Sequence, residues 1–168
     1  RARACAVLTC IGTVLEDDPQ LDVRAVPTPR QPTLVVMDSQ LETPLTAKLF
    51  IPQRPVWIYC AVDNVERRQA LETKGAQVIC LPNSSGKVDL AAMLKDLGQK
   101  QINEVHVEAG HKLNGSLLRE GLVDELLTYL APKLMGQGRG MTNLGPFTTL
   151  DDAKALSFHE VTQIGPDL

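Results

Sequence analysis

The sequence predicts an α/β fold, in which a mostly parallel central sheet carries helices on both faces. Two observations lead to this prediction. Short apolar runs alternate along the chain with helical stretches of about ten residues, as expected for strands joined by right-handed helical crossovers. Several runs are apolar on both faces, which is typical of strands in a covered parallel sheet. The 168 residues fit one domain with its own core.

Six runs have the length and the apolar character of strands. They are residues 5–9, 32–38, 55–61, 76–82, 104–110 and 125–132. A later run, residues 155–165, reads as the final strand, and its partner at the sheet edge is expected to be antiparallel.

Three stretches between these runs have helical character. Residues 63–75 begin with Asp63 and Glu66 in a capping-box arrangement and stop at a glycine. Residues 88–98 place four apolar side chains on one helical stripe, and residues 112–121 also end at a glycine. These helices supply the crossovers that a parallel sheet requires.

Composition and charge exclude several classes of protein. The formal net charge of −3 argues against an electrostatic binder of nucleic acid or membranes. No apolar run reaches the roughly 18 residues that span a bilayer. The four cysteines lack the spacing of a zinc site, so we expect no metal, buried reduced thiols and a cytoplasmic protein.

The segment "VHVEAGHKLNGS", residues 105–116, places a carboxylate and a glycine where a strand leads into a helix. The first turn of a helix has free N–H groups and a positive dipole end, which attract phosphate. Gly110 allows a ligand to approach the backbone closely, and Lys112 adds a positive charge. A glycine-bearing turn also serves purely structural ends, so both interpretations stay open here.

Glu108 closes the strand that precedes this turn, with His106 on the same face. Its carboxylate is either a solvated strand end or an acceptor for the hydroxyl and N–H groups of a ligand. His106 is expected to be a structural histidine.

A second polar cluster follows the first strand, in the segment "IGTVLEDDPQLDVR", residues 11–24. The strand is expected to run into Gly12 and Thr13, with a helical half-turn behind it. Asp18 precedes a proline and suits a turn, which leaves Asp17 without a structural role. Arg24 is placed to bind a phosphate or a carboxylate.

These segments, together with "VVMDS", "LVDELLTYLAPKLMG" and the terminal "IGPDL", resemble the reductase domain of the bacterial bifunctional riboflavin-biosynthesis deaminase/reductase. The resemblance runs along almost the whole chain, so residues 1–168 are expected to be one reductase domain. It implies a dihydrofolate-reductase-like fold. It also implies that NADPH reduces 5-amino-6-(5-phosphoribosylamino)uracil to its ribitylamino form, with hydride delivered to C1′ of the ribose.

The resemblance also assigns roles by position. Thr13 and Asp17 would contact the nicotinamide end of NADPH, and Asp17 would assist proton delivery as the catalytic group. Ser39 would touch the cofactor. The cofactor-phosphate loop would comprise Gly110, His111, Lys112, Leu113, Asn114, Gly115 and Ser116. The substrate would contact Leu21, Arg24 and Glu108, with Arg24 on the 5′-phosphate.

Departures from the family shape the remaining expectations. The front strand, with its S-[LM]-D-G motif and a further substrate arginine on the following helix, has no counterpart, so we expect a truncated domain without its first strand. The zinc-binding deaminase motifs are also absent. A homodimer is expected, with residues 125–136 apolar enough for an interface, and core burial explains that stretch equally well. Two alternatives stay open, namely a related NADPH reductase acting on a pterin or sugar-amine, and a non-catalytic nucleotide-binding or dimerisation module.

Overall fold

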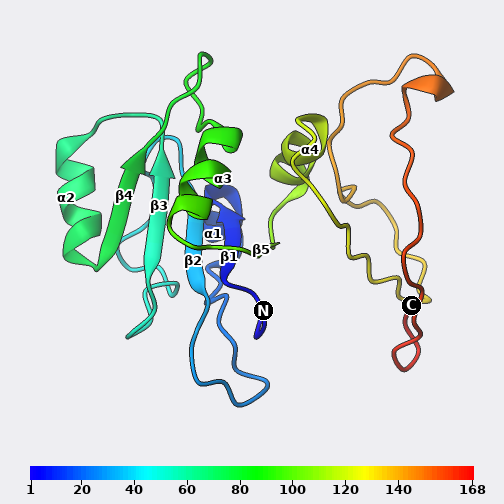
Figure 1. The fold of residues 1–168 in the computed structure, drawn as a ribbon, viewed down its shortest axis with the longest axis horizontal. Helices are drawn as coiled ribbons and strands as arrows, with labels where there is room; N and C mark the ends of the chain where they lie inside the picture. Colours follow the sequence, from blue (N-terminus) through cyan, green and yellow to red (C-terminus); the bar gives the residue numbers. More distant parts are fainter. The chain divides into compact units, whose positions relative to one another are not determined.

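The computed structural model describes residues 1–168, except for the side chain of Leu150. The chain forms two compact units, Arg1–Gly110 and His111–Leu168. The first unit contains the sheet, and the second begins with helix α4 (Figure 1).

The first unit is a five-stranded sheet in the order β4-β3-β2-β1-β5. Its strands are β1 (Ala6–Cys10), β2 (Thr33–Met37), β3 (Val56–Cys60), β4 (Ala76–Cys80) and β5 (Val105–Val107). All neighbouring strands pair in parallel, which confirms the mostly parallel sheet. Figure 1 shows the five strands side by side, with α2 beyond β4.

Three helices connect these strands, namely α1 (Ile11–Asp17), α2 (Val65–Thr73) and α3 (Leu90–Gln99). The expected half-turn after β1 is wrong, because Gly12 and Thr13 lie inside α1 rather than at the end of a strand. The cap expected for α2 is also one residue off. Asn64 is the N-cap, and its side chain accepts a hydrogen bond from the backbone N–H of Arg67, so Asp63 lies outside the helix.

Helices cover both faces of the sheet, as expected for a parallel sheet. On one face, Ile58 and Cys60 of β3 pack in one buried cluster with Leu71 of α2. On the other face, the hydroxyl of Tyr59 bonds to Asp96 of α3. Side chains along a strand alternate between the two faces, which is why neighbours on β3 reach different helices.

The second unit contains α4 (His111–Arg119) and a short 3-10 helix, η1 (Leu150–Asp152). The strands predicted at residues 125–132 and 155–165 are wrong, and so is the antiparallel edge, because no ladder forms at either segment within the described chain. The two segments expose large apolar side chains, among them Leu127 at 63% and Phe158 at 93%. Apolar character predicted strands there, but no layer covers these side chains.

A short backbone pairing is nevertheless present in this unit. The N–H of Leu130 donates to the carbonyl of Leu168 at 2.7 Å, and the reverse hydrogen bond measures 3.1 Å. In the part of the chain that the structure describes, no helix is both long and apolar enough to cross a membrane.

Candidate functional site

The carboxyl edge of the sheet carries most of the residues that the sequence singled out. Helix α1, with Thr13 and Asp17, follows β1, while Ser39 follows β2 and Glu108 follows β5. Parallel strands end at the same edge, and ligands of open α/β sheets bind there. The topology therefore brings Thr13, Ser39 and Glu108 to one edge, and Asp17 lies at the other end of α1.

Arg1 connects the two charged residues that were predicted to hold substrate. Its guanidinium donates twice to the carboxylate of Glu108, once at 2.5 Å, and once to the carbonyl oxygen of Asp22 at 3.0 Å. The carboxylate of Asp22 in turn accepts a hydrogen bond from Arg24 at 2.6 Å. Glu108 and Arg24 are thus linked through Arg1 and Asp22. Sequence reasoning missed both linking residues, because nothing in their spacing indicates the contact.

These contacts fix the charge of the two carboxylates. The hydrogen bonds from Arg1 hold the pKa of Glu108 below its usual value, outweighing the effect of burial. For Asp22, burial acts to raise the pKa, but the hydrogen bond from Arg24 helps to bring it below its usual value. His106 lies beside this group, with its Nε2 atom 3.4 Å from Oε1 of Glu108. Glu108 is consequently an ionised acceptor at neutral pH.

Leu21 contributes to the site differently from its charged neighbours. Its side chain is 5% exposed and belongs to the buried core cluster. Its backbone has a φ of 53°, a left-handed conformation that is uncommon outside glycine. A ligand at Leu21 would therefore meet its backbone and not its side chain.

The two aspartates after β1 have different surroundings. Asp18 ends α1 in a left-handed conformation, and its carboxylate accepts a hydrogen bond from the N–H of Lys48 at 2.9 Å. Asp17 is exposed, and no hydrogen bond or ion pair to another described residue holds its carboxylate. Thr13 lies one turn earlier, with its hydroxyl 3.6 Å from the sulfur of Cys10.

Ser39 lies in a turn that is held by the fully buried carboxylate of Asp38. That carboxylate accepts hydrogen bonds from the backbone of Glu42 and from both the backbone and the hydroxyl of Thr43. The carbonyl of Ser39 accepts from Ala61, directly after β3, at 3.0 Å. The hydroxyl of Ser39 accepts from the N–H of Val88 at 3.3 Å. Ser39 is therefore held at the carboxyl edge.

The predicted cofactor-phosphate loop is a helix for most of its length. Residues 111–116 form the first turns of α4, and only Gly110 precedes the helix. A Cβ atom built on Gly110 meets no other heavy atom within 4 Å. The structure of the chain itself therefore does not need a glycine there, and the space beside this backbone is free.

The side chains along α4 have other partners within the second unit. Leu113 is buried, and a Cβ on Gly115 would collide with the backbone of Asn143. The side-chain amide of Asn114 donates to the carbonyl of Met141 at 3.1 Å, and the hydroxyl of Ser116 donates to the backbone carbonyl of Lys112. These four positions thus have structural roles that the sequence did not reveal. Lys112 is exposed, and His111 is half-buried.

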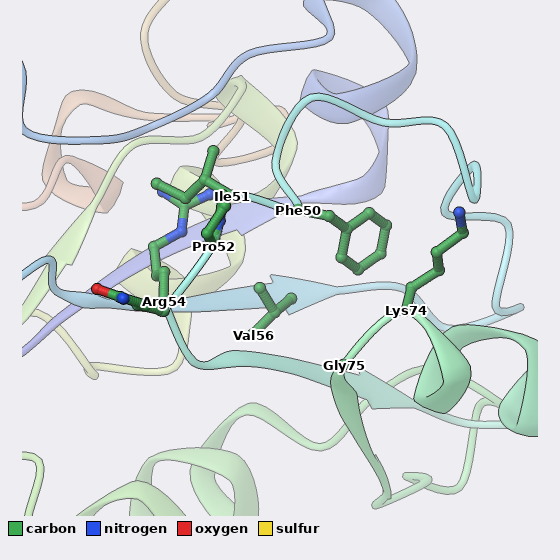
Figure 2. A pocket seen from close by; sticks show the side chains of 8 residues that line it. Phe50, Ile51, Pro52, Arg54, Val56, Lys74 and Gly75 are labelled. Carbon is green, nitrogen blue, oxygen red and sulfur yellow. The ribbon is translucent and has the colours of Figure 1, made fainter.

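A separate hollow of about 360 Å³ lies at the amino ends of β3 and β4 (Figure 2). Phe50 and Lys74 lie on one side of it, and Ile51 and Arg54 on the other. Arg54 is 5% exposed, and its guanidinium donates to the carbonyl of Leu49. Burial lowers the pKa of Arg54 to about 10. None of the predicted site residues lines this hollow.

Among the described residues, no three His, Cys, Asp or Glu side chains cluster in a way that could hold a metal ion. All four cysteines are free; Cys60 is buried, and the others are half-buried, so the expectation of fully buried thiols is correct only for Cys60. The site's polar groups are thus carboxylates, arginines, hydroxyls and backbone amides.

A parallel α/β domain with a polar carboxyl edge is the class that these observations define. The chain belongs to the family of RibD C-terminal domains, whose family model matches residues 1–168. This confirms the resemblance to the reductase domain of the riboflavin-biosynthesis protein.

Curated relatives match over the full chain. The riboflavin biosynthesis protein RibD of Escherichia coli (strain K12) is 38% identical over 181 residues, covering 100% of this chain and 48% of the relative. RibD of Aquifex aeolicus is 34% identical over 168 residues, covering 100% of this chain and 46% of the relative. The chain therefore spans about half the length of these relatives. A protein named 5-amino-6-(5-phosphoribosylamino)uracil reductase, from Buchnera aphidicola, is 26% identical over 181 residues, covering 100% and 86%.

Solved structures agree on the fold. Acinetobacter baumannii RibD, form 1, matches with a TM-score of 0.80 and 33% identity, covering 98% of this chain and 45% of that chain. The deaminase/reductase of Thermotoga maritima matches with a TM-score of 0.80 at 22% identity, covering 99% and 44%, which supports the fold alone. The fold is thus the dihydrofolate-reductase-like one that the sequence predicted.

Proposed function

We propose that this chain carries out the NADPH-dependent reduction of 5-amino-6-(5-phosphoribosylamino)uracil, as the reductase domain of a riboflavin-biosynthesis protein. Its family and the name of the Buchnera relative support the reaction. The observation that carries the proposal is the charged group in which Arg1 and Asp22 connect Glu108 with Arg24. That group offers both an anion site and an ionised acceptor to one small phosphorylated molecule.

The substrate's phosphate would bind at Arg24. The Arg24 side chain is 66% exposed, so its guanidinium has free donors besides the one bonded to Asp22. Guanidinium groups bind phosphate through paired hydrogen bonds, which also orient the ligand. Glu108, kept ionised by Arg1, would accept hydrogen bonds from N–H or hydroxyl groups of the same molecule. Leu21 would contribute a backbone contact.

NADPH, when bound, supplies the hydride that C1′ of the substrate receives. In the first unit, Thr13, Asp17 and Ser39 would contact the cofactor at the carboxyl edge. Asp17 would pass the proton that the substrate nitrogen takes up as its double bond is reduced. The exposed, unpartnered carboxylate of Asp17 suits this role better than that of Asp18, which Lys48 holds.

Cofactor phosphates would bind at residues 110–116. Helix α4 has nine residues, and the free N–H groups of its first turn attract anions. The open space beside Gly110 gives a phosphate room to approach, and exposed Lys112 adds a positive charge. Leu113, Asn114, Gly115 and Ser116 would act mainly by holding the helix in place.

The wider setting follows the family. We propose that residues 1–168 act as a reductase domain, in a homodimer and in the reducing cytoplasm, where the four free cysteines form no permanent disulfide. Residues 125–136 are the proposed dimer contact, because several of their large apolar side chains are exposed.

The test measures NADPH binding by fluorescence and NADPH oxidation by absorbance for this chain. Oxidation that depends on the ribosylaminouracil phosphate supports the proposal. Turnover with dihydrofolate in its place would identify a pterin reductase instead. Saturable NADPH binding without turnover would indicate a non-catalytic module.

A further inference from the structure

Two cysteines from different strands lie side by side in the sheet. Cys60 of β3 and Cys80 of β4 are paired in register, so their side chains point to the same face. Both thiols donate a hydrogen bond to the same carbonyl oxygen, that of Val62, at 3.4 and 3.7 Å. The shared acceptor shows that both sulfur atoms lie close to the same backbone carbonyl. Neither thiol has a role in the reaction proposed above.

The backbone spacing at this pair is compatible with a disulfide. Neighbouring strands lie about 4.8 Å apart, and the Cα atoms of disulfide-bonded cysteines are usually about 4.4–6.8 Å apart. The strand spacing falls at the short end of that range. Disulfides in a reducing cytoplasm are usually transient, so a bond formed there would act as a switch rather than as a permanent crosslink.

We propose that Cys60 and Cys80 are a redox site, and that they form a reversible disulfide by exchange with a low-molecular-weight disulfide such as oxidised glutathione. Cys80 is half-buried, so it is the thiol that reacts first with oxidised glutathione. Cys60 is fully buried and reacts second, with the sulfur of Cys80. This site lies beyond the proposed reductase function, because it needs neither NADPH nor substrate.

The exchange balances in two steps. The Cys80 thiolate attacks one sulfur of oxidised glutathione, which forms a mixed disulfide and releases one glutathione thiolate. The Cys60 thiolate then attacks the sulfur of Cys80, which forms the Cys60–Cys80 bond and releases the second glutathione. Two electrons pass from the protein thiols to the reagent, and the two protons end on the released glutathione molecules.

The electrostatic surroundings favour this order of steps. Burial and then the neighbouring Cys80 raise the pKa of Cys60 to about 12, so Cys60 is the poorer first nucleophile. A mixed disulfide on Cys80 removes that neighbour's ability to carry charge and eases ionisation of Cys60. Arg68, which donates to the carbonyl of Val78 at 2.9 Å, supplies a nearby positive charge that favours the thiolate.

The bond would act on the carboxyl edge of the sheet. The residue after Cys60, Ala61, donates to the carbonyl of Ser39, and the residue after Cys80, Leu81, donates to the carbonyl of Cys60. Backbone hydrogen bonds between neighbouring strand ends therefore connect the thiol pair to Ser39. A crosslink between β3 and β4 would restrain both strand ends at this edge.

The test equilibrates the full chain in glutathione buffers of increasing oxidised fraction, stops exchange with acid, and alkylates the remaining thiols after denaturation. Trypsin cuts after Arg67, Arg68 and Lys74, between the two cysteines, and does not cut the Arg54–Pro55 bond. The expected result is the loss of two alkylated thiols per chain and a disulfide joining peptide 49–67 to peptide 75–87. Added dithiothreitol should separate the two peptides.

Variants provide the matched controls. A chain carrying both Cys5→Ser and Cys10→Ser keeps only the proposed pair and should form the same linked peptides at the same glutathione ratio. Cys80→Ser should abolish them. The proposal is overturned if the wild-type chain yields only mixed glutathione adducts, no oxidation at any ratio, or linked peptides that involve Cys5 or Cys10. The peptide map of the wild-type chain shows whether the Cys60–Cys80 disulfide forms even if a variant fails to fold.

Discussion

The hydroxyl of Tyr59 donates a 2.6 Å hydrogen bond to the carboxylate of Asp96, which ties β3 to α3. Lys100 holds the same carboxylate from the next turn of the chain at 2.5 Å. Its ammonium also lies 5.8 Å from the ring centre of Trp57. The Asp96 carboxylate thus connects α3 to one face of the sheet, and it accepts hydrogen bonds from both Tyr59 and Lys100.

Removal of the Tyr59 hydroxyl should destabilise the fold. We expect Tyr59→Phe to lower the free energy of unfolding by about 1.5–3 kcal/mol, since the lost hydrogen bond is to a charged group. Urea unfolding followed by Trp57 fluorescence measures the change. Tyr129→Phe is the matched control, because that ring is 68% exposed. Equal stabilities of the Tyr59→Phe variant and the wild type would contradict a stabilising role for this contact.

The Arg1–Glu108 pair should make stability depend on pH in the acid range. Because Arg1 depresses the pKa of Glu108, the pair stabilises the fold above the ordinary glutamate pKa of about 4.3. This stability is lost as the pH falls through the lower folded pKa. We expect Arg1→Ala to cost about 0.5–1 kcal/mol at pH 7, since the pair is partly exposed, and nothing in strong acid. Arg3→Ala controls for loss of a positive charge, and urea unfolding at several pH values gives the comparison.

Asp17 and Asp18 should respond differently to substitution. Asp17→Asn is expected to lower turnover by roughly 100-fold or more, the usual contribution of a proton-transfer group, with an unchanged melting temperature. Asp18→Ala should lower stability by about 1–2 kcal/mol, because the N–H of Lys48 loses its acceptor. Steady-state kinetics and thermal unfolding distinguish the two. A wild-type rate for Asp17→Asn would exclude Asp17 from proton transfer.

Arg24→Ala should weaken the binding of the phosphorylated substrate far more than that of the cofactor. Loss of a charge-assisted contact of about 1.5–3 kcal/mol corresponds to roughly a 10- to 100-fold rise in KM for the substrate. The KM for NADPH should stay within about twofold of the wild-type value, a margin of roughly 0.4 kcal/mol. Equal rises in both constants would remove the phosphate role from Arg24.

Substitutions at two glycines should distinguish an effect on ligand binding from an effect on packing. Gly110→Val is expected to fold normally, because the added side chain enters free space, and to weaken NADPH binding by crowding its phosphates. Gly115→Ala should destabilise the second unit, since its Cβ collides with the backbone of Asn143. Fluorescence titration and thermal unfolding are the measurements. Gly98→Ala, which also enters free space, is the control.

The sequence predicted β2, β3 and β4 well because other parts of the first unit bury most of their apolar side chains. The runs at 32–38, 55–61 and 76–82 contain β2, β3 and β4, and helices α2 and α3 lie where the patterns placed them. The segments at 125–132 and 155–165 have the same apolar character but no covering layer. The local sequence pattern shows which residues are apolar, but it does not show whether another part of the chain buries them.

A feature of the site could be predicted from the sequence only where one continuous segment contains all the residues that form it. The proline after Asp18 marks the end of α1 in the sequence, but the hydrogen bond that gives Asp18 its structural role comes from Lys48, 30 positions away. The Arg1–Glu108 contact joins residues 107 positions apart, and the collision of Gly115 with Asn143 joins a helix to a distant loop. Such pairings arise from the folded chain path, so no spacing rule indicates them.

The position of β1 in the sheet has a consequence for how the protein is made. β1 lies between β2 and β5, and the carbonyl of Glu104 accepts hydrogen bonds from Cys5 and Ala6. On the ribosome, β1 leaves the exit tunnel long before β5 is synthesised. Until then one edge of β1 is unpaired and open to other chains. Arg1 and Glu108 can meet only after β5 has joined the sheet, so the charged part of the site is completed late in synthesis.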